Sequence, residues 1–538
     1  MKWNPPPGRM FVFAVVLPFV SIASILSSVT SIVGASEEPG EPFRHGPEYF
    51  PADDPDAEAV RELALRGELP LGFATVRPFT RSVLARSLRS GNSAGSATRD
   101  LLVEEVEDEL GTLSGSPRPR RGVAAFERII PGGSFRLRPY VWFDAKWKDA
   151  RGISWGDQPR VGARGTAHYG PRFAVHQDVF LGRVRDGRRF ADALVNHTDL
   201  LVFVESAYAS FQSDHWEARI GRLRQSVGPG GESSLLLSPR AGAFDHLGYS
   251  VRLGSLRFRS MTGVLRTATE KNIALHRLEW SAHPRFILAV TEGAVFQGSP
   301  VQPLYLMGFV PYTIVERLQG QDALSANGVP LVRNNLVWQF DATWRAFRSG
   351  AVWSEILVDD VGTETSDLPT RLGFQVGVDV VPRTRWGDAK LGLRAAKVYD
   401  FTYSVSYENS DWAHQGRPLG YPEGPDVEQA SVELGIRPTK EWSTSVRLQV
   451  IRKGEGRIGS PWYGEGDPRS EQNPPGPEYD LRGVVERRLG IDWTLAWTPS
   501  GTVRIESRVH IEAVENLDHE AGNDEPEARF DLLARWHR

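Results

Sequence analysis

Three polar segments of the chain combine aromatic side chains with carboxylate, amide or imidazole groups. An aromatic face can stack against the C–H face of a sugar ring while polar groups bind the ring hydroxyls. The candidate sugar-binding residues are Trp155 and Asp157 in the first segment, Trp412, His414 and Tyr421 in the second, and Trp462, Tyr463 and Glu465 in the third. We expect the third segment, residues 454–479, to be the main binding loop because it is long and otherwise too polar to pack. Each aromatic residue could instead pack within its own loop.

One short motif has the form of a hydrolase site. Residues 152–156, GISWG, match the Gly-X-Ser-X-Gly pattern in which Ser154 would be the nucleophile. That chemistry needs a strand-to-helix turn, whereas this segment lies between two stretches with strand periodicity. Nothing in the sequence selects a histidine and an acid as its partners. We therefore predict that the protein is not an enzyme, and keep acyl hydrolysis as an alternative that Ser154→Ala would test.

The sequence predicts no metal and no cofactor. The glycine-rich stretch at residues 227–232 is followed by neither Gly-Lys-Ser/Thr nor a helical pattern, so we expect a tight loop that turns inward, not a phosphate site. The acidic residues Asp359, Asp360, Glu364 and Asp367 lack the spacing of a calcium loop. The 12 histidines are scattered, and the absence of cysteine excludes thiolate ligands.

The elements that would carry these segments alternate with a period of two. In residues 502–513 the apolar Val503, Ile505, Val509 and Ile511 alternate with charged or imidazole side chains. This pattern predicts a strand with one apolar and one polar face. Similar stretches recur from residue 135 to the C-terminus, and at roughly 22 residues per strand and turn they give about 18 strands. An even number of strands with a charged second face favours a closed transmembrane β-barrel over a soluble sandwich or propeller.

We expect the charged face of the strands to line the barrel lumen. The predicted lumen residues are Arg222, Arg224, Arg504, Glu506, Arg508 and Glu512. They could line the open pore of a porin or transport channel, or the inner wall of a closed barrel, and conductance would distinguish the two. Other predicted strands include residues 163–180, 402–407, 481–488 and 491–498.

The N-terminus has the features of an export signal. Lys2 and Arg9 precede or flank a largely apolar stretch at residues 11–33, and the small residues at 33–35 suit signal peptidase. We predict that residues 1–35 are removed; an uncleaved anchor helix is the alternative. Without these two basic residues the formal net charge falls below −4, so electrostatics does not favour a nucleic-acid partner. Export followed by a barrel predicts the bacterial outer membrane.

The mature chain divides into four expected parts. Residues 36–53 are a flexible start, residues 54–113 a small periplasmic α-helical segment, residues 114–133 a linker and residues 134–538 the barrel. Three short helices are expected in the second part, where they could cover one another or plug the barrel. The expected partners are a surface polysaccharide, outer-membrane lipid including lipopolysaccharide, and the barrel-assembly machinery. The machinery would recognise the last strand, although that strand ends in His-Arg and not on an aromatic residue.

Residues 221–248, GRLRQSVGPGGESSLLLSPRAGAFDHLG, resemble a signature of the capsule assembly protein Wzi family. Residues 65–88, 334–360 and 417–420 are similar to other parts of the family in the same order. The resemblance implies an 18-stranded outer-membrane barrel with a periplasmic helical bundle. It also implies surface loops that bind capsular polysaccharide and hold it at the cell surface, without catalysis.

Overall fold

The computed structural model describes most of the chain. The described residues are 46–90, 95–107, 109–110, 126–130, 132–148, 152–155, 160–183, 200–322, 334–360, 370–405, 409–459, 480–500 and 502–537. Within these residues we find no helix that is both long enough and apolar enough to cross a membrane.

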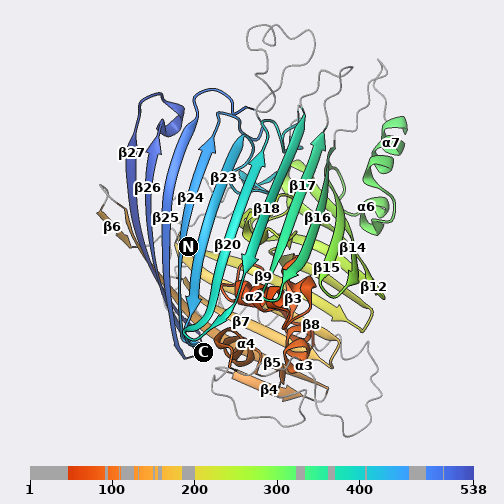
Figure 1. Cartoon of the computed structure of the whole chain (residues 1–538). Helices are drawn as coiled ribbons and strands as arrows, with labels where there is room; N and C mark the ends of the chain where they lie inside the picture. Colours follow the sequence, from red (N-terminus) through yellow and green to blue (C-terminus); the bar gives the residue numbers. More distant parts are fainter. Residues whose placement is uncertain are drawn as a thin grey trace, which may run out of the picture.

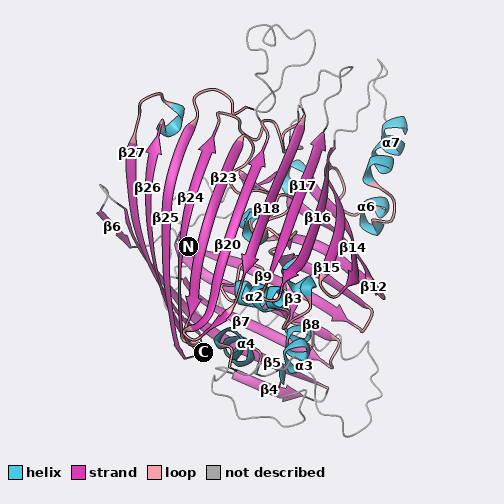
Figure 2. Ribbon diagram, viewed as in Figure 1, coloured by secondary structure: helices cyan, strands magenta, loops and turns pink. Residues whose placement is uncertain are grey.

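Long antiparallel strands form one closed barrel (Figures 1 and 2). The eighteen wall strands are β5 (Gly133–Lys148), β7 (Arg160–Tyr169), β8 (Phe173–Arg183), β9 (Leu200–Gln212), β10 (Trp216–Leu223), β12 (Phe244–Leu253), β13 (Leu256–Arg266), β14 (Lys271–His283), β15 (Phe286–Gln297), β16 (Asn335–Phe347), β17 (Gly350–Asp360), β18 (Arg371–Val380), β20 (Gly387–Val398), β23 (Val427–Arg437), β24 (Trp442–Lys453), β25 (Glu486–Ser500), β26 (Val503–Glu515) and β27 (Glu525–His537). The last strand pairs with β5, where Phe530 lies opposite Trp147. The closed order of strands confirms the predicted all-β transmembrane barrel of about 18 strands. Closure suits a membrane because it leaves no unpaired sheet edge to face lipid.

Two of the predicted strand boundaries are wrong. Residues 163–180 form a hairpin of β7 and β8, because the chain reverses at Gly170, whose φ of 57° suits a residue without a side chain. Residues 481–488 and 491–498 contribute to a single strand, β25, because Gly490 continues the pairing with β24 and makes no turn.

The strand predicted at residues 402–407 is wrong for its described part, residues 402–405, which form turns. Phe401 and Tyr403 have positive φ values of 61° and 75°, which reverse the backbone instead of extending it. The Tyr403 N–H donates a hydrogen bond of 2.6 Å to a carboxylate oxygen of Asp359 at the end of β17. This turn begins a loop that folds back over the barrel lumen.

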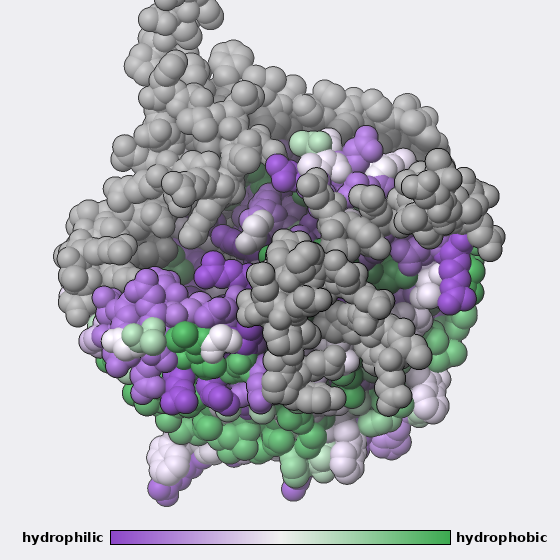
Figure 3. Space-filling model, turned by 90° about the horizontal axis from the view of Figure 1, so that it is seen from above, coloured by the Kyte–Doolittle hydropathy of each residue, from purple (hydrophilic) through white to green (hydrophobic). Residues whose placement is uncertain are grey.

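Successive residues of each wall strand face opposite sides of the barrel. Large apolar side chains on the outer face are exposed in the isolated chain: Leu278, Trp280, Phe340, Trp344, Leu434, Leu448 and Ile511. Polar side chains gather around the hollow of the barrel when it is seen from one end (Figure 3). An apolar outer face and a polar interior are what a bilayer and an aqueous lumen require.

The two ends of the barrel differ in their connections. Short turns join the strands at one end, near which the C-terminus lies (Figure 1). Much longer segments join them at the other end, including residues 224–243, 298–334, 399–426 and 454–485. We refer to the two as the short-turn end and the long-loop end.

The three predicted helices lie at the short-turn end of the barrel (Figure 1). They are α2 (Ala57–Arg66), α3 (Arg81–Ser90) and α4 (Ala97–Glu105). α2 ends before Gly67, which adopts the left-handed conformation with φ 88°. The helix begins after Asp56. The helices share an apolar core with wall residues such as Ile287 and Ala351, so they plug the barrel and are not a separate unit.

Candidate functional site

Three segments of the described chain lie one above another within the barrel lumen. The first is the plug, the described residues between 46 and 110. The second is the inner loop, residues 224–243, and the third is the lid loop, the described residues between 399 and 426. The plug strand β2 (Val76–Arg77) pairs with β11 (Ser226–Val227) of the inner loop. The inner loop in turn meets the lid loop, because the Ser238 N–H donates a 2.7 Å hydrogen bond to the carbonyl of Leu419. Backbone pairing therefore connects all three layers.

The inner loop is fixed to the barrel wall by Glu355 of β17, whose side chain is fully buried. Its carboxylate accepts hydrogen bonds from the N–H of Gly230 at 2.6 Å and from the N–H of Leu235 at 2.8 Å. The Gln375 side-chain amide donates a third bond of 2.7 Å. A Cβ at Gly230 would lie 2.2 Å from that amide nitrogen, so the close approach requires glycine. The predicted inward-turning glycine loop is confirmed.

The apolar residues of the inner loop form the core between the layers. Leu235, Leu236 and Leu237 are fully buried in a cluster that extends across the lumen to the lid loop. The lid residue Trp412 lies in the same cluster, and its indole N–H donates a 2.7 Å hydrogen bond to the carbonyl of Leu236. The Tyr403 hydroxyl donates to the carbonyl of Leu235 at 2.6 Å. The Ser-Leu-Leu-Leu-Ser run is thus the surface against which the lid loop packs.

Ion pairs fix the plug to the wall. Arg61 of α2 lies 2.6 Å from Asp379 of β18, and both side chains are almost completely buried. Burial alone would lower the pKa of Arg61, but the carboxylates of Asp379 and Glu58 raise it above its ordinary value. Arg66 lies 3.0 Å from Asp388 of β20. A buried pair of this kind is costly to break from one side, so these contacts specify how the plug sits in the barrel.

The structure buries the second predicted sugar-binding segment. Trp412, His414 and Tyr421 are at most 4% exposed, and all three lie in the lid loop over the inner loop. Their aromatic faces contact protein, as the His414 ring does with Phe244 at a centroid separation of 6.1 Å. Burial, with the nearby Arg222 guanidinium, lowers the pKa of His414 to about 4. These three residues pack the lid and present no surface to a glycan in this conformation, which corrects the expectation that they form an exposed site.

The other predicted sugar-binding residues lie at or beyond the limits of the described residues. Trp155 is the last residue of β6 (Gly152–Trp155), and its backbone pairs with Ala145 of β5. Asp157, Trp462, Tyr463 and Glu465 lie outside the described residues. Their role in binding remains a prediction.

Most of the predicted lumen residues face the interior. Arg504 of β26 contacts Asp56 of the plug at 2.9 Å, and Glu506, which is almost completely buried, contacts Arg508 at 2.5 Å. Glu512 lies on the same face of β26, 3.8 Å from His510. The positions share one face because they are an even number of residues apart.

The two predicted lumen residues near the inner loop differ in position. Arg224 contacts Glu205 at 2.7 Å and Asp53 of the plug at 3.2 Å, as expected for the interior. Arg222 pairs with Asp245 at 3.3 Å and shares the outer face of β10 with the exposed Ile220. The prediction for Arg222 is therefore wrong, because the inward-facing residues of this strand have odd numbers.

A charged patch remains open to solvent between the inner loop and the wall strands β24 to β26. It consists of Glu232, Arg240, Arg447, Asp492, His510 and Arg508. Glu232 and Arg240 form an ion pair of 3.2 Å, and His510 contacts Asp492 at 2.7 Å. Burial would raise the pKa of Glu232, but the guanidinium groups of Arg240 and Arg447 lower it. The patch offers both donors and acceptors to hydroxyl and charged groups.

Sequence reasoning identified part of this arrangement and missed the rest. It placed Arg508 on the inner wall and the glycine loop in the lumen, but not the anchors Glu355 and Asp379. Their partners in the inner loop and the plug are more than 100 residues away in the sequence, so no local pattern marks them. Among the described residues we find no cluster of histidine, cysteine or acidic side chains arranged to hold a metal ion.

The family model named capsule assembly protein Wzi matches residues 151–528. The structure resembles that of Wzi, described as an outer membrane protein involved in group 1 capsule assembly in Escherichia coli and as a carbohydrate binding beta-barrel. The TM-score is 0.57 at 14% identity, covering 91% of this chain and 98% of that one.

Two other solved barrels are similar to a lesser degree. Pseudomonas aeruginosa OprD has a TM-score of 0.43 at 10% identity, covering 77% of this chain and 97% of that one. OccK10 (OpdN) of the same organism has a TM-score of 0.43 at 10% identity, covering 76% and 99%. A comparison with curated proteins finds no match.

Proposed function

We propose, from the premise that the chain belongs to the capsule assembly protein Wzi family, that it binds capsular or other surface polysaccharide and holds it at the cell surface. The barrel lies in the bacterial outer membrane. The solved Wzi of Escherichia coli is described as carbohydrate binding, and it shares the fold of this chain. Long loops of such barrels normally face the cell exterior, which would direct the lid loop and the charged patch outward and the plug toward the periplasm.

The filled lumen is the observation that carries this proposal. The plug, inner loop and lid loop lie one above another, and hydrogen bonds and buried side chains connect each to the next. A porin needs a continuous aqueous path, whereas a protein that holds a polymer needs a stable outer surface. The stack supports a role in binding polysaccharide and not in passing solutes. Transport through an open channel is the alternative, which conductance tests.

The binding surface would combine the charged patch with the long loops. The patch provides guanidinium, imidazole and carboxylate groups that can pair with sugar hydroxyls and with acidic sugar substituents. Stacking faces would come from Trp155, Trp462 and Tyr463, with Asp157 and Glu465 beside them.

A non-catalytic role is part of the proposal. Ser154 lies in β6, and its backbone pairs with Lys146 of β5. The nucleophile elbow of a hydrolase places its serine on a turn from a strand into a helix, so the placement of Ser154 supports coincidence as the origin of the motif. The remaining proposed partners are outer-membrane lipid, including lipopolysaccharide, and the barrel-assembly machinery during insertion.

Glycan-array binding by the refolded protein tests this function. We expect the full chain to bind a subset of bacterial surface polysaccharides and a variant without residues 454–479 to bind them more weakly by about tenfold, equivalent to loss of one or two stacking contacts. A matched variant, Lys440→Ala in the short turn between β23 and β24, should bind like the parent. Equal binding by the deletion would refute the choice of loop, and no binding by the full chain would refute the function.

A further inference from the structure

One sector of the barrel has polar residues on its outer face. Ser260 and Thr262 of β13, His276 of β14 and Glu292 of β15 all have the same parity as neighbours that face outward. On β14, for example, Leu278 is exposed two residues after His276. A carboxylate on this face would normally meet lipid, where it is unfavourable. Yet Glu292 is fully buried, so protein covers it.

The cover is an outer hairpin, residues 299–322, which contains α6 (Pro303–Met307) and α7 (Tyr312–Asp322). It lies outside the wall beside β14 and β15 (Figure 1). The Ser260 hydroxyl donates a hydrogen bond of 3.2 Å to the carbonyl of Leu306, and the Thr262 hydroxyl donates one of 3.2 Å to the carbonyl of Pro300. A Cβ at Gly308 would lie 2.5 Å from the Ser260 hydroxyl, so glycine permits this contact between backbone and wall.

Glu292 holds the start of α7. Its carboxylate accepts hydrogen bonds from the N–H of Tyr312 at 2.7 Å and from the N–H of Thr313 at 3.0 Å, and the Thr313 hydroxyl donates a third of 2.8 Å. On its other side it lies 3.0 Å from the His276 imidazole. A carboxylate at a helix N-terminus satisfies free N–H groups and complements the helix dipole. Ser260, Thr262 and Glu292 of the wall thus have hydrogen-bond partners in the hairpin, and His276 pairs with Glu292.

Aromatic packing completes the contact between hairpin and wall. Tyr305 of α6 stacks on Phe296 of β15 with ring centroids 4.2 Å apart and an interplanar angle of 4°. Phe309 stacks on Phe258 of β13 at 5.1 Å. Tyr305, together with Tyr312 and the wall residue Ala274, is fully buried in a small core on the outside of the barrel. The hairpin is therefore a folded part of the wall and not a loose loop.

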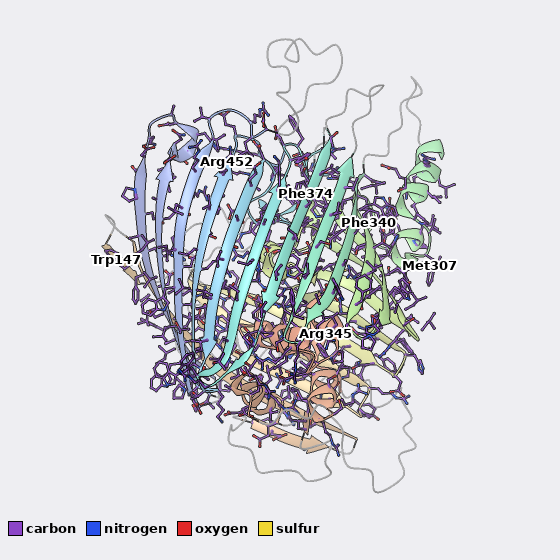
Figure 4. All side chains as sticks on the ribbon, viewed as in Figure 1. Trp147, Met307, Phe340, Arg345, Phe374 and Arg452 are labelled. Atoms are coloured by element: carbon purple, nitrogen blue, oxygen red, sulfur yellow. The ribbon has the colours of Figure 1, made fainter. Side chains whose placement is uncertain are left out.

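The side of the hairpin away from the wall is largely apolar and exposed. Its exposed large apolar residues are Val301, Met307, Phe309, Ile314 and Leu318. Arg317 is exposed beside Leu318 and is the charged residue on this side. In Figure 4, Met307 lies lower along the barrel, nearer the short-turn end, than Phe340, a wall residue whose side chain is exposed on the outer face. The apolar outer face of the barrel thus continues over the hairpin. Among the described residues nothing else covers this surface.

We infer that the outer hairpin is a membrane-embedded element whose exposed face contacts the acyl chains of the outer leaflet. The hairpin covers the polar sector of β13 to β15 and presents an apolar surface in its place. On this side of the barrel the lipid therefore contacts the hairpin and not the wall strands. The inference rests on the outer-membrane location and is independent of polysaccharide binding. Its partner is lipid, because the hairpin joins strands at the long-loop end and its apolar face continues that of the wall.

Fluorescence quenching tests the inference, and the lack of cysteine in the chain makes single labels possible. Phe309→Cys and Leu318→Cys, each labelled with a small environment-sensitive fluorophore, are refolded into phosphatidylcholine vesicles with and without bromine on the acyl chains. We expect quenching by brominated lipid as strong as that of a label at Phe340→Cys, and little quenching by aqueous iodide. Ala521→Cys, in an exposed turn at the long-loop end, should show the reverse.

Two outcomes would overturn the inference. Iodide quenching of the hairpin labels at the level of Ala521→Cys would place the hairpin in water, and quenching by neither agent would mean that protein covers it. The anchor is tested by Glu292→Ala in the Leu318→Cys background. With folding confirmed by heat-modifiable migration, bromine quenching should fall toward the level of Ala521→Cys, and unchanged quenching would contradict the role of Glu292.

Discussion

His414 shows how a residue of a suitable type can serve packing instead of ligand binding. This lid-loop residue packs its ring against Phe244, and burial with the nearby Arg222 lowers its pKa to about 4. Trp412 and Tyr421 share this interior position. Composition alone made all three attractive as sugar contacts, because a polar segment with aromatic residues is expected to be exposed. The expectation is wrong here because the long loop folds back into the lumen and buries its aromatic residues.

Acid should loosen the lid loop through His414. The folded-state pKa of about 4 lies below the ordinary value of 6.5, so the unfolded loop binds a proton more readily. The stabilising contribution of the neutral ring is therefore complete above pH 6.5 and is lost as pH falls toward 4, by up to about 1.4 kcal/mol per pH unit. Hydrogen exchange of the lid amides at pH 7 and pH 4.5, corrected for the intrinsic rate, measures the effect.

The matched control is His414→Phe, which keeps an aromatic ring but cannot titrate. Burial raises the pKa values of the lid carboxyls Asp400, Asp411 and Asp426, and these groups act in the opposite direction. The readout is therefore the difference between the parent and the variant. An identical change of protection with pH in both proteins would contradict the role given to His414.

At the scale of elements, the inner loop is the part that the sequence marked most clearly. Its glycines indicated an inward turn, and the structure confirms that the loop lies in the lumen, where it meets Glu355 and the lid core. The sequence could not identify Glu355 itself, because β17 is separated from the loop by several strands. It also gave no sign of the outer hairpin, whose polar contacts lie on wall positions that alternation assigns to lipid.

Removal of the Glu355 carboxylate should release the inner loop. Glu355→Ala leaves the N–H groups of Gly230 and Leu235 without their acceptor, at a cost of about 1–3 kcal/mol for each buried group. We expect faster hydrogen exchange at these two amides and a lower unfolding temperature. Glu355→Gln, which keeps one acceptor oxygen, should lie between the variant and the parent.

A control at the surface separates this effect from a general loss of charge. Glu515 at the outer end of β26 is exposed and pairs loosely with Arg487 at 3.6 Å, so Glu515→Ala should leave exchange in the inner loop unchanged. Unaltered protection of Gly230 and Leu235 in Glu355→Ala would show that the carboxylate does not hold the loop.

At the scale of the whole molecule, the barrel was predictable and its filling only partly so. Alternation predicted the faces of most strands, and their average length predicted their number, because the period of two does not depend on how the loops fold. The helical pattern of residues 54–113 predicted the three helices but left open whether they cover one another or plug the barrel. The buried pair Arg61–Asp379 decides for the plug, and no local pattern connects residues so far apart.

We propose that the stack of plug, inner loop and lid loop makes the barrel a support for its outer surface and not a passage. Conductance of the refolded full chain in planar bilayers tests this most directly, with insertion verified beforehand by flotation with vesicles. The account predicts no steady conductance above that of the bare bilayer. A steady, large, ohmic conductance would contradict it and would identify the protein as a channel.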